Sequence, residues 1–457
     1  MRTKTVRQMY LDYTLPSSST KVVAAYREKY AALNELLLAN PAVLDLVHAD
    51  FCRWLSSSDS GRESRYTSDE ILRTLVVMFV EQDSYRDVVV RIENSEFLRG
   101  FVGFGFVKPM MDFSFVGKAF AALSEETWKA VNLSLAQYAK EEEWISGEKL
   151  RTDTTAYEAN IHYPADSSLL WDSFRVLARV LRLVQKELPA LGFTHRYHDK
   201  KVKKLAFYIA RNAKSKSKAT QRKVKRAYRT LIDRVRWIAE VSQDVQQRLP
   251  LLFLEAPDLE QYTPIVERII DQAERRIFGG EAVPSGEKVY SLFEEHTELL
   301  VRGKAGKPVE FGHKVLIAQT GEKFISHYCV LPKREEDKDL LNAAIEAHRE
   351  LFGRAPGTLA ADKGFYESVQ QLKALEEEIE TVSICKKGRR TEAEEAREHS
   401  DAFRDGQRFR AGVEGSISVL KRAFKLNCCL FKGYKNFASS VGCAVFCHNL
   451  VLLANIQ

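Results

Sequence analysis

The sequence has few cysteines and no apolar leader. Its seven cysteines, an odd number, are scattered over 457 residues, which excludes a fully paired disulfide framework and favours a reduced, cytoplasmic setting. The first 19 residues mix charged residues with tyrosines around no apolar core, so we expect no signal peptide. Near the C-terminus, the residues that could suggest a zinc site are Cys428, Cys429, Cys443, Cys447 and His448. Their spacing matches no paired zinc-ligand pattern, and we predict buried thiols there.

Long hydrophobic runs are also scarce. Residues 437–455 contain no Lys, Arg, Asp or Glu, and this run is long enough to be considered as a membrane span. Serine, histidine and asparagine residues interrupt it, and such polar groups are costly in lipid. We therefore predict a buried helix and no membrane partner.

Positive charge is concentrated in one segment. The net charge is only +7, but residues 196–236 contain sixteen Lys and Arg against two Asp, a local charge of +14 that leaves −7 for the rest. A localised cationic tract with interleaved Tyr and Phe favours a sequence-independent surface for the DNA backbone over the alternative, a solvated pair of charged helices. The residues predicted to contact DNA there are Lys200, Lys201, Lys203, Lys204, Arg222, Lys223, Lys225 and Arg226.

The first 145 residues have a helical pattern throughout. A chain of 457 residues is too long for one ordinary core, so we expect two or three domains. Apolar periodicity predicts helices at 21–38, 42–55 and 114–139, with a serine-rich joint at 56–60. A capping box at Thr67–Glu70 starts another helix, and a short helix at 85–92 follows closely. This last pair resembles a helix-turn-helix, although a plain helical hairpin has the same pattern.

The remainder of the chain alternates strand-type and helix-type segments. Strand-type runs are predicted at 148–157, 160–163, 288–293, 310–319, 323–331, 357–361 and 381–385. Helices are predicted at 337–352 and 369–377, a charged loop at 386–405, and long helices over roughly 168–280. We therefore expect an α/β layer fold interrupted by a long, all-helical, basic insertion.

Three acidic residues occupy positions that suit a metal site. Asp153 lies within the first predicted strand and Asp362 at the end of a later buried one, where an ionised acid is costly unless a cation or donor meets it. Glu414 lies on a C-terminal helix and shares one face with Arg410 and Lys421, because steps of four and seven residues nearly close whole turns. An amphipathic surface helix with internal ion pairs is the alternative interpretation of this helix.

The blocks around these acids resemble the DDE transposases of bacterial insertion sequences. The matching segments are Arg-Thr-Asp153-Thr-Thr, Ala-Ala-Asp362-Lys-Gly-Phe-Tyr and Arg410-x3-Glu414-x6-Lys421. The family signature normally places a Tyr three residues before the Arg, and this chain has Gln407 there. The resemblance implies an RNase H-like mixed-sheet catalytic domain at 146–457, with the helical insertion, after an N-terminal helical domain at 1–145 that binds DNA or dimerises.

The resemblance also implies a chemistry. Asp153, Asp362 and Glu414 would be the catalytic acids and would bind two Mg²⁺ or Mn²⁺ ions, while Arg410 and Lys421 contact DNA phosphates. The expected function is binding of terminal inverted repeats, followed by metal-dependent cleavage and strand transfer, by a homodimer at the paired ends. The alternatives are a structure-selective DNA nuclease of the same fold and a catalytically inactive DNA-binding protein derived from a transposase.

Overall fold

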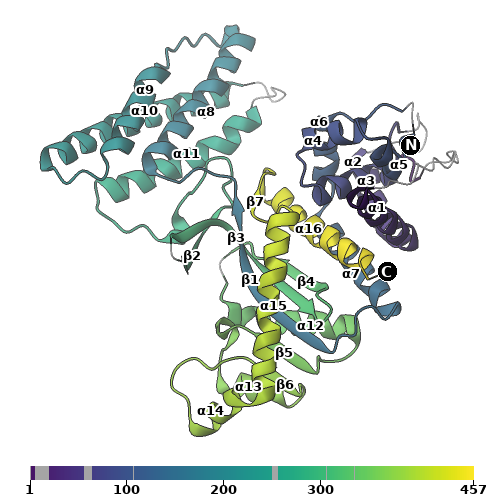
Figure 1. The fold of residues 1–457 in the computed structure, drawn as a ribbon. Helices are drawn as coiled ribbons and strands as arrows, with labels where there is room; N and C mark the ends of the chain where they lie inside the picture. Colours follow the sequence, from purple (N-terminus) through teal and green to yellow (C-terminus); the bar gives the residue numbers. More distant parts are fainter. Residues whose placement is uncertain are drawn as a thin grey trace. The chain divides into compact units, whose positions relative to one another are not determined.

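The computed structural model describes residues 2–5, 20–55, 64–105, 108–249, 256–304, 306–333 and 335–456. The chain forms two compact units (Figure 1). Unit 1 comprises Met1–Glu158 and His313–Gln457, and unit 2 comprises Ala159–Gly312. The N-terminal helices thus belong to the same unit as most of the sheet, and the helical insertion predicted at about 168–280 lies inside unit 2.

Seven helices form the N-terminal part of unit 1. They are α1 (Lys21–Ala39), α2 (Pro41–Leu55), α3 (Ser68–Val80), α4 (Tyr85–Glu93), α5 (Glu96–Val102), α6 (Phe113–Ala122) and α7 (Glu125–Glu141). The predicted capping box at the start of α3 is confirmed, because Thr67 Oγ1 accepts from the Glu70 N–H while the Glu70 carboxylate accepts from the Thr67 N–H. The predicted serine-rich joint at 56–60 lies outside the described residues.

The uncharged C-terminal run forms α16 (Tyr434–Ala454). Among the described helices, α16 is long and apolar enough to cross a membrane, but 83% of its most apolar window is buried inside the protein. It packs against α1, α3 and α7, which explains the lack of charge on every face. The buried helix predicted for this run is therefore confirmed, and Cys443 and Cys447 lie inside it as buried free thiols.

The described strands form one mixed sheet of seven. They are β1 (Lys149–Ala159), β2 (Glu298–Lys304), β3 (Lys307–Thr320), β4 (Ile325–Val330), β5 (Thr358–Ala361), β6 (Thr381–Ser383) and β7 (Cys428–Cys429). The order is β2-β3-β1-β5-β6, with β4 also paired to β3 and β7 to β1. The pairs β2–β3 and β3–β4 are antiparallel, whereas β1–β5 and β5–β6 are parallel. The mixed α/β class is as predicted.

Two predicted strands are not strands. Residues 160–163 make local turns, in which the Ile161 N–H bonds the Ala159 carbonyl and the Ala165 N–H bonds the Tyr163 carbonyl, on either side of a proline that has no N–H to donate. In the other segment, 288–293, the Val289 N–H bonds the Gln272 side chain. Side chains and turns thus satisfy donors that a strand would offer to a neighbour, and the edge strand is β2 instead.

The predicted charged loop at 386–405 is also wrong. It contains α14 (Glu392–His399), and the long helix α15 (Asp401–Ala423) begins inside it. Thr391 and Glu394 form a capping box at the start of α14, and the Ser400 hydroxyl caps α15 by accepting from the Phe403 N–H. The many charged residues of this segment were interpreted as a loop, although Thr391 and Ser400 are ordinary helix N-cap residues.

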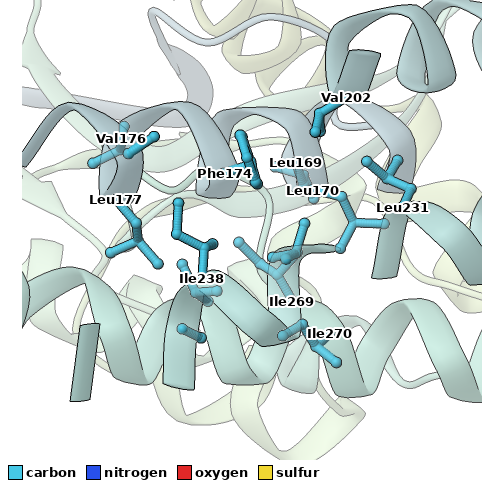
Figure 2. Packing of buried hydrophobic residues seen from close by; sticks show 14 of the residues in the cluster. Leu169, Leu170, Phe174, Val176, Leu177, Val202, Leu231, Ile238, Ile269 and Ile270 are labelled. Carbon is cyan, nitrogen blue, oxygen red and sulfur yellow. The ribbon is translucent and has the colours of Figure 1, made fainter. Parts of the chain in front are cut away.

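Unit 2 is built around four long helices. They are α8 (Asp166–Glu187), α9 (Asp199–Asn212), α10 (Lys218–Arg248) and α11 (Ala256–Ile277). Figure 2 shows their shared core, in which Leu169, Phe174, Leu231, Ile238 and Ile269 meet. All five side chains are fully buried, so the basic tract has an apolar side that packs and a charged side that does not.

Helices cover both faces of the sheet in unit 1. Leu150, Leu316 and Leu359 share a buried cluster with α12 (Asp337–Phe352) and α13 (Val369–Glu376). Side chains alternate along a strand, so the neighbouring residues of these strands face the other way. That second face meets α15, where Arg151 of β1 donates to the Phe409 carbonyl and Gln319 of β3 bonds the Ser416 hydroxyl. Short 3-10 turns lie at Pro189–Leu191, Ser285–Glu287 and Lys363–Phe365.

A buried histidine on α12 makes stability depend on pH. His348 Nε2 donates to the Gly147 carbonyl at 3.0 Å, and burial lowers the pKa of His348 from 6.5 to about 4. As the pH falls, His348 is therefore protonated near pH 6.5 in the unfolded chain but only near pH 4 in the folded chain. The free energy of unfolding is full above that window and falls as pH drops through it. In urea titrations on either side of pH 6.5, His348→Gln should lose less stability on acidification than the parent; an equal loss contradicts the assignment.

Candidate active site

Two of the predicted acids lie side by side where the short strand β5 ends next to the middle of β1. The register pairs Thr152 of β1 with Ala361 of β5, so Asp153 and Asp362 occupy the next positions on neighbouring strands. Parallel strands lie about 4.8 Å apart, and residues in register point to the same face. Both carboxylates therefore project from the face that α15 covers. In each, Oδ1 accepts from the following backbone N–H, Thr154 or Lys363, at 2.7 Å.

The third predicted acid is connected to this pair through an arginine. Arg410 on α15 places one Nη1 3.7 Å from Asp153 Oδ2 and 3.1 Å from Glu414 Oε1 (Figure 1 shows α15). Arg410 and Asp153 are each 19% exposed at the side chain, whereas Glu414 is 63% exposed. A half-buried cation thus separates the carboxylate on the helix from the one on the strand.

Asp153 has the most constrained carboxylate of the three. Burial raises the pKa of Asp153, and the Thr154 N–H and the Arg410 guanidinium partly offset that rise. Two further carboxylates, Asp362 and Asp337, also raise the pKa of Asp153. Like charges held around a buried acid create a position that attracts a cation.

Close contacts of α15 with the sheet hold Arg410 and Glu414 in place. A Cβ on Gly406 would lie 2.5 Å from Ser383 Cβ on β6, so only a glycine permits this approach. Next to it, Gln407 Nε2 donates to the Ser383 carbonyl at 2.7 Å and to the Ser383 hydroxyl at 3.1 Å. Gln407, which stands where the transposase signature has a Tyr, therefore anchors α15 to β6 in this chain.

Lys421 lies on the strand side of α15. Its Nζ donates to the Ala156 carbonyl of β1 at 2.8 Å, three residues beyond Asp153. The sequence placed Lys421 on the same helix face as Arg410 and Glu414. In the structure Lys421 and Arg410 reach β1, and Glu414 contacts Arg410. Contact with a phosphate at this position requires Lys421 to exchange a backbone carbonyl for the phosphate oxygen.

Sequence reasoning missed a fourth acid at this site. Asp337, the first residue of α12, accepts from the Thr154 hydroxyl at 3.0 Å and from Lys314 Nζ at 3.0 Å. A Cβ on Gly364, in the turn after Asp362, would lie 2.8 Å from Asp337 Oδ2. An acid in the first turn of a helix is a common capping feature, so nothing in the sequence distinguished Asp337 from Asp339. Only the sheet brings it beside Thr154.

Asp337 is expected to support Asp153 through Thr154. Asp337→Ala leaves the Thr154 hydroxyl and the Lys314 ammonium without this acceptor, which loosens the part of β1 that holds Asp153. Loss of such a supporting partner lowers metal affinity or activity by about 10- to 100-fold. Titration with Mn²⁺ measures the effect, with the exposed Asp339→Ala as the matched control in the same helical turn. Equal metal affinities for both variants contradict the supporting role.

The acid pair fits a divalent cation. Carboxylate oxygens are the ligands that Mg²⁺ prefers, and Asp153 Oδ2 already has a cation, Arg410, as its neighbour. Among the residues that the structure describes, no three His, Cys, Asp or Glu side chains are close enough to form a complete metal-ligand group. Glu414 therefore fits as a third ligand only when its ion pair with Arg410 opens.

The predicted DNA-contact residues of the basic tract lie on α9 and α10 of unit 2. All eight are solvent exposed, and none forms an ion pair with another described residue. Neither acid of the tract pairs with these eight residues, because Asp199 pairs with Arg182 outside the tract and Asp233 lies 3.8 Å from Arg236 at its end. The cations of this surface therefore remain without internal counter-charges.

Comparison of the chain with models of protein families, with curated proteins and with solved structures finds no match. The geometry of the site and the charge of unit 2 are thus the basis for assigning a function.

Proposed function

We propose that this protein is a DDE-type transposase of a bacterial insertion sequence with an RNase H-like catalytic domain. The observation that carries the proposal is the parallel register of β1 and β5, which puts Asp153 beside Asp362 on the face that α15 covers. Two acids on neighbouring parallel strands and a third on the helix that covers them would form the acid set of metal-dependent phosphodiester chemistry. The exposed cations of unit 2 supply a surface for the DNA backbone.

The residues of the chain divide the work between metal and DNA. Asp153, Asp362 and Glu414 would hold Mg²⁺ or Mn²⁺, and two such ions, when bound, stabilise the attacking and leaving oxygens at phosphorus. The Thr154 N–H fixes one oxygen of Asp153 and leaves the other towards the site. Arg410, released from Glu414, and Lys421 would bind the phosphates on either side of the reacting bond.

Recognition of the element would involve the N-terminal helices and a second copy of the chain. The pair α3–α4, joined by a tight turn, suits reading of the terminal inverted repeats. Synapsis of two ends favours a homodimer in the cytoplasm, working on double-stranded DNA as both donor and target.

The test is a reaction on the DNA that flanks the gene. Purified protein and Mg²⁺ or Mn²⁺ should cut at short inverted repeats and join the 3′ ends to a target plasmid, and both ends should migrate in one complex. Cleavage of branched or gapped DNA without regard to end sequence identifies a structure-selective nuclease instead. Tight DNA binding without cleavage in either metal identifies a catalytically inactive DNA-binding protein.

A further inference from the structure

An exposed phenylalanine lies in the middle of the cationic face of α9. The side chain of Phe207 is 64% exposed and that of its neighbour Tyr208 is 37% exposed, whereas Val202, Ala206 and Ile209 of the same helix are buried. Leaving an aromatic ring in water gains none of the free energy that burial provides. A binding partner that covers the Phe207 ring would therefore gain this free energy.

The helix geometry places the ring between cations. Lys200, Lys204, Phe207 and Arg211 follow at steps of four, three and four residues, so they lie along one line of α9. That line is opposite the one formed by Val202, Ala206 and Ile209, and it therefore points to solvent. From Lys200 to Arg211 it spans roughly 16 Å at the helical rise per residue.

The electrostatics of this line are unfavourable for the isolated protein. Lys200, Lys204 and Arg211 are exposed and have no ion-pair partner among the described residues, and like charges one turn apart destabilise a helix. Lys203 Nζ lies 5.6 Å from the centre of the Phe207 ring, and no other aromatic ring in the described residues packs on it. Several features that destabilise the isolated helix, namely repelling cations and an exposed aromatic ring, thus occur on one face, which indicates a functional surface.

We propose that this face of α9 binds DNA that carries unpaired bases, with Phe207 stacking on a base and the flanking cations on the phosphates. The inference rests on the proposed function, from which it takes DNA as the partner. Contacts to a duplex backbone are made by charged and hydrogen-bonding groups, which leave a phenyl ring nothing to stack on. Single-stranded segments offer both a charged backbone and open aromatic faces, and proteins bind them with cationic grooves that carry aromatic side chains.

Binding measurements on two DNA molecules test the proposal. One is a fluorescently labelled duplex, and the other is the same duplex with a short unpaired gap. Phe207→Ala should lower the affinity for gapped DNA by about 5- to 100-fold and leave the affinity for the duplex unchanged, while Phe207→Trp should retain both. A stacking-sensitive fluorescent base in the gap should be quenched by the parent and by Phe207→Trp but not by Phe207→Ala.

Two control variants separate stacking from charge. Phe278→Ala removes another partly exposed phenylalanine of unit 2, which lies under the Arg229 guanidinium outside the α9 line, and should change neither affinity. The double variant Lys200→Gln and Lys204→Gln should weaken binding to both DNA molecules and reduce the salt dependence by about one unit of slope per lost phosphate contact.

The outcomes distinguish this inference from the proposed function. In one outcome, the parent binds duplex DNA, the lysine variant binds it more weakly, and Phe207→Ala binds gapped DNA as tightly as the parent. The stacking site is then wrong and the DNA-binding function stands. If the parent binds neither DNA, the proposed function fails and the inference with it. If Phe207→Ala instead converts a dimer to a monomer in solution, the face is a contact between copies of this chain and the inference is overturned.

Discussion

Asp153→Asn is expected to lower metal-dependent DNA cleavage by at least about 10³-fold while DNA binding remains unchanged. The substitution preserves the shape of the side chain and its ability to accept from the Thr154 N–H. It removes the negative charge that, beside Asp362 and opposite Arg410, makes this position attractive to a cation. Gel-based rates of strand cleavage at saturating DNA measure the loss, and fluorescence anisotropy measures binding.

The same variant should not unfold the protein. Burial raises the pKa of Asp153, so the ionised carboxylate destabilises the metal-free folded state near neutral pH. A neutral amide removes that cost, and the free energy of unfolding of metal-free Asp153→Asn should equal or exceed that of the parent. Asp362→Asn and Glu414→Gln should likewise bind DNA and fail to cut it.

Glu148→Gln is the matched control for this series. Glu148 directly precedes β1, and its carboxylate pairs with Arg354 at the protein surface. Such exposed ion pairs contribute little to stability, and cleavage should remain at the level of the parent. Cleavage by Asp153→Asn at the rate of Glu148→Gln would falsify the active-site assignment.

How much of this site the sequence predicts depends on how local each signal is. Asp153 and Asp362 were predicted because an acid inside or directly after an apolar strand is unusual in its immediate neighbourhood. That the two acids are neighbours could not be predicted in this way. It depends on the parallel register of two strands about two hundred residues apart, which periodicity alone does not specify.

Interactions across the fold account for what the sequence left out. Asp337 looks like any acid in a first helical turn, and only its hydrogen bond to Thr154 connects it to the site. The contact of Arg410 with DNA stays a prediction, and what the sequence did not predict is its ion pair with Asp153 on β1. Gln407 was a departure from a motif and proved to be an anchor on Ser383. The helices of the basic tract, by contrast, follow from local apolar periodicity and were predicted well.

The geometry of the site also depends on a glycine outside it, and Gly406→Ala is the second variant with a large expected effect. The new Cβ would lie 2.5 Å from Ser383 Cβ and 2.8 Å from Ser383 Oγ, which is far inside contact distance. Ser383 is a buried strand residue, so it has no flexible end that can move aside. Overpacking of this kind typically destabilises a protein by about 1–3 kcal/mol.

Relief of that clash moves α15 away from β6. The hydrogen bonds from Gln407 to Ser383 and from Ser383 to the Phe403 carbonyl then lengthen. Arg410 and Glu414 follow on the same rigid helix, one and two turns further on, and their distance from Asp153 increases. Displacements of about 1 Å at a reacting centre cost about 100-fold in rate. Gly406→Ala should therefore lower both the thermal midpoint and the cleavage rate.

Gly415→Ala separates this packing effect from helix propensity. Gly415 is exposed on the same helix, next to Glu414, and an added Cβ there would meet nothing within 4 Å. Alanine in place of glycine inside a helix stabilises by about 0.5–1 kcal/mol, so this variant should raise the thermal midpoint and keep full cleavage. If Gly406→Ala also raises the midpoint and cuts normally, α15 does not rest on β6 as described. Opposite shifts of the thermal midpoint in the two variants mean that the close contact between Gly406 and Ser383, and not helix propensity, determines the effect.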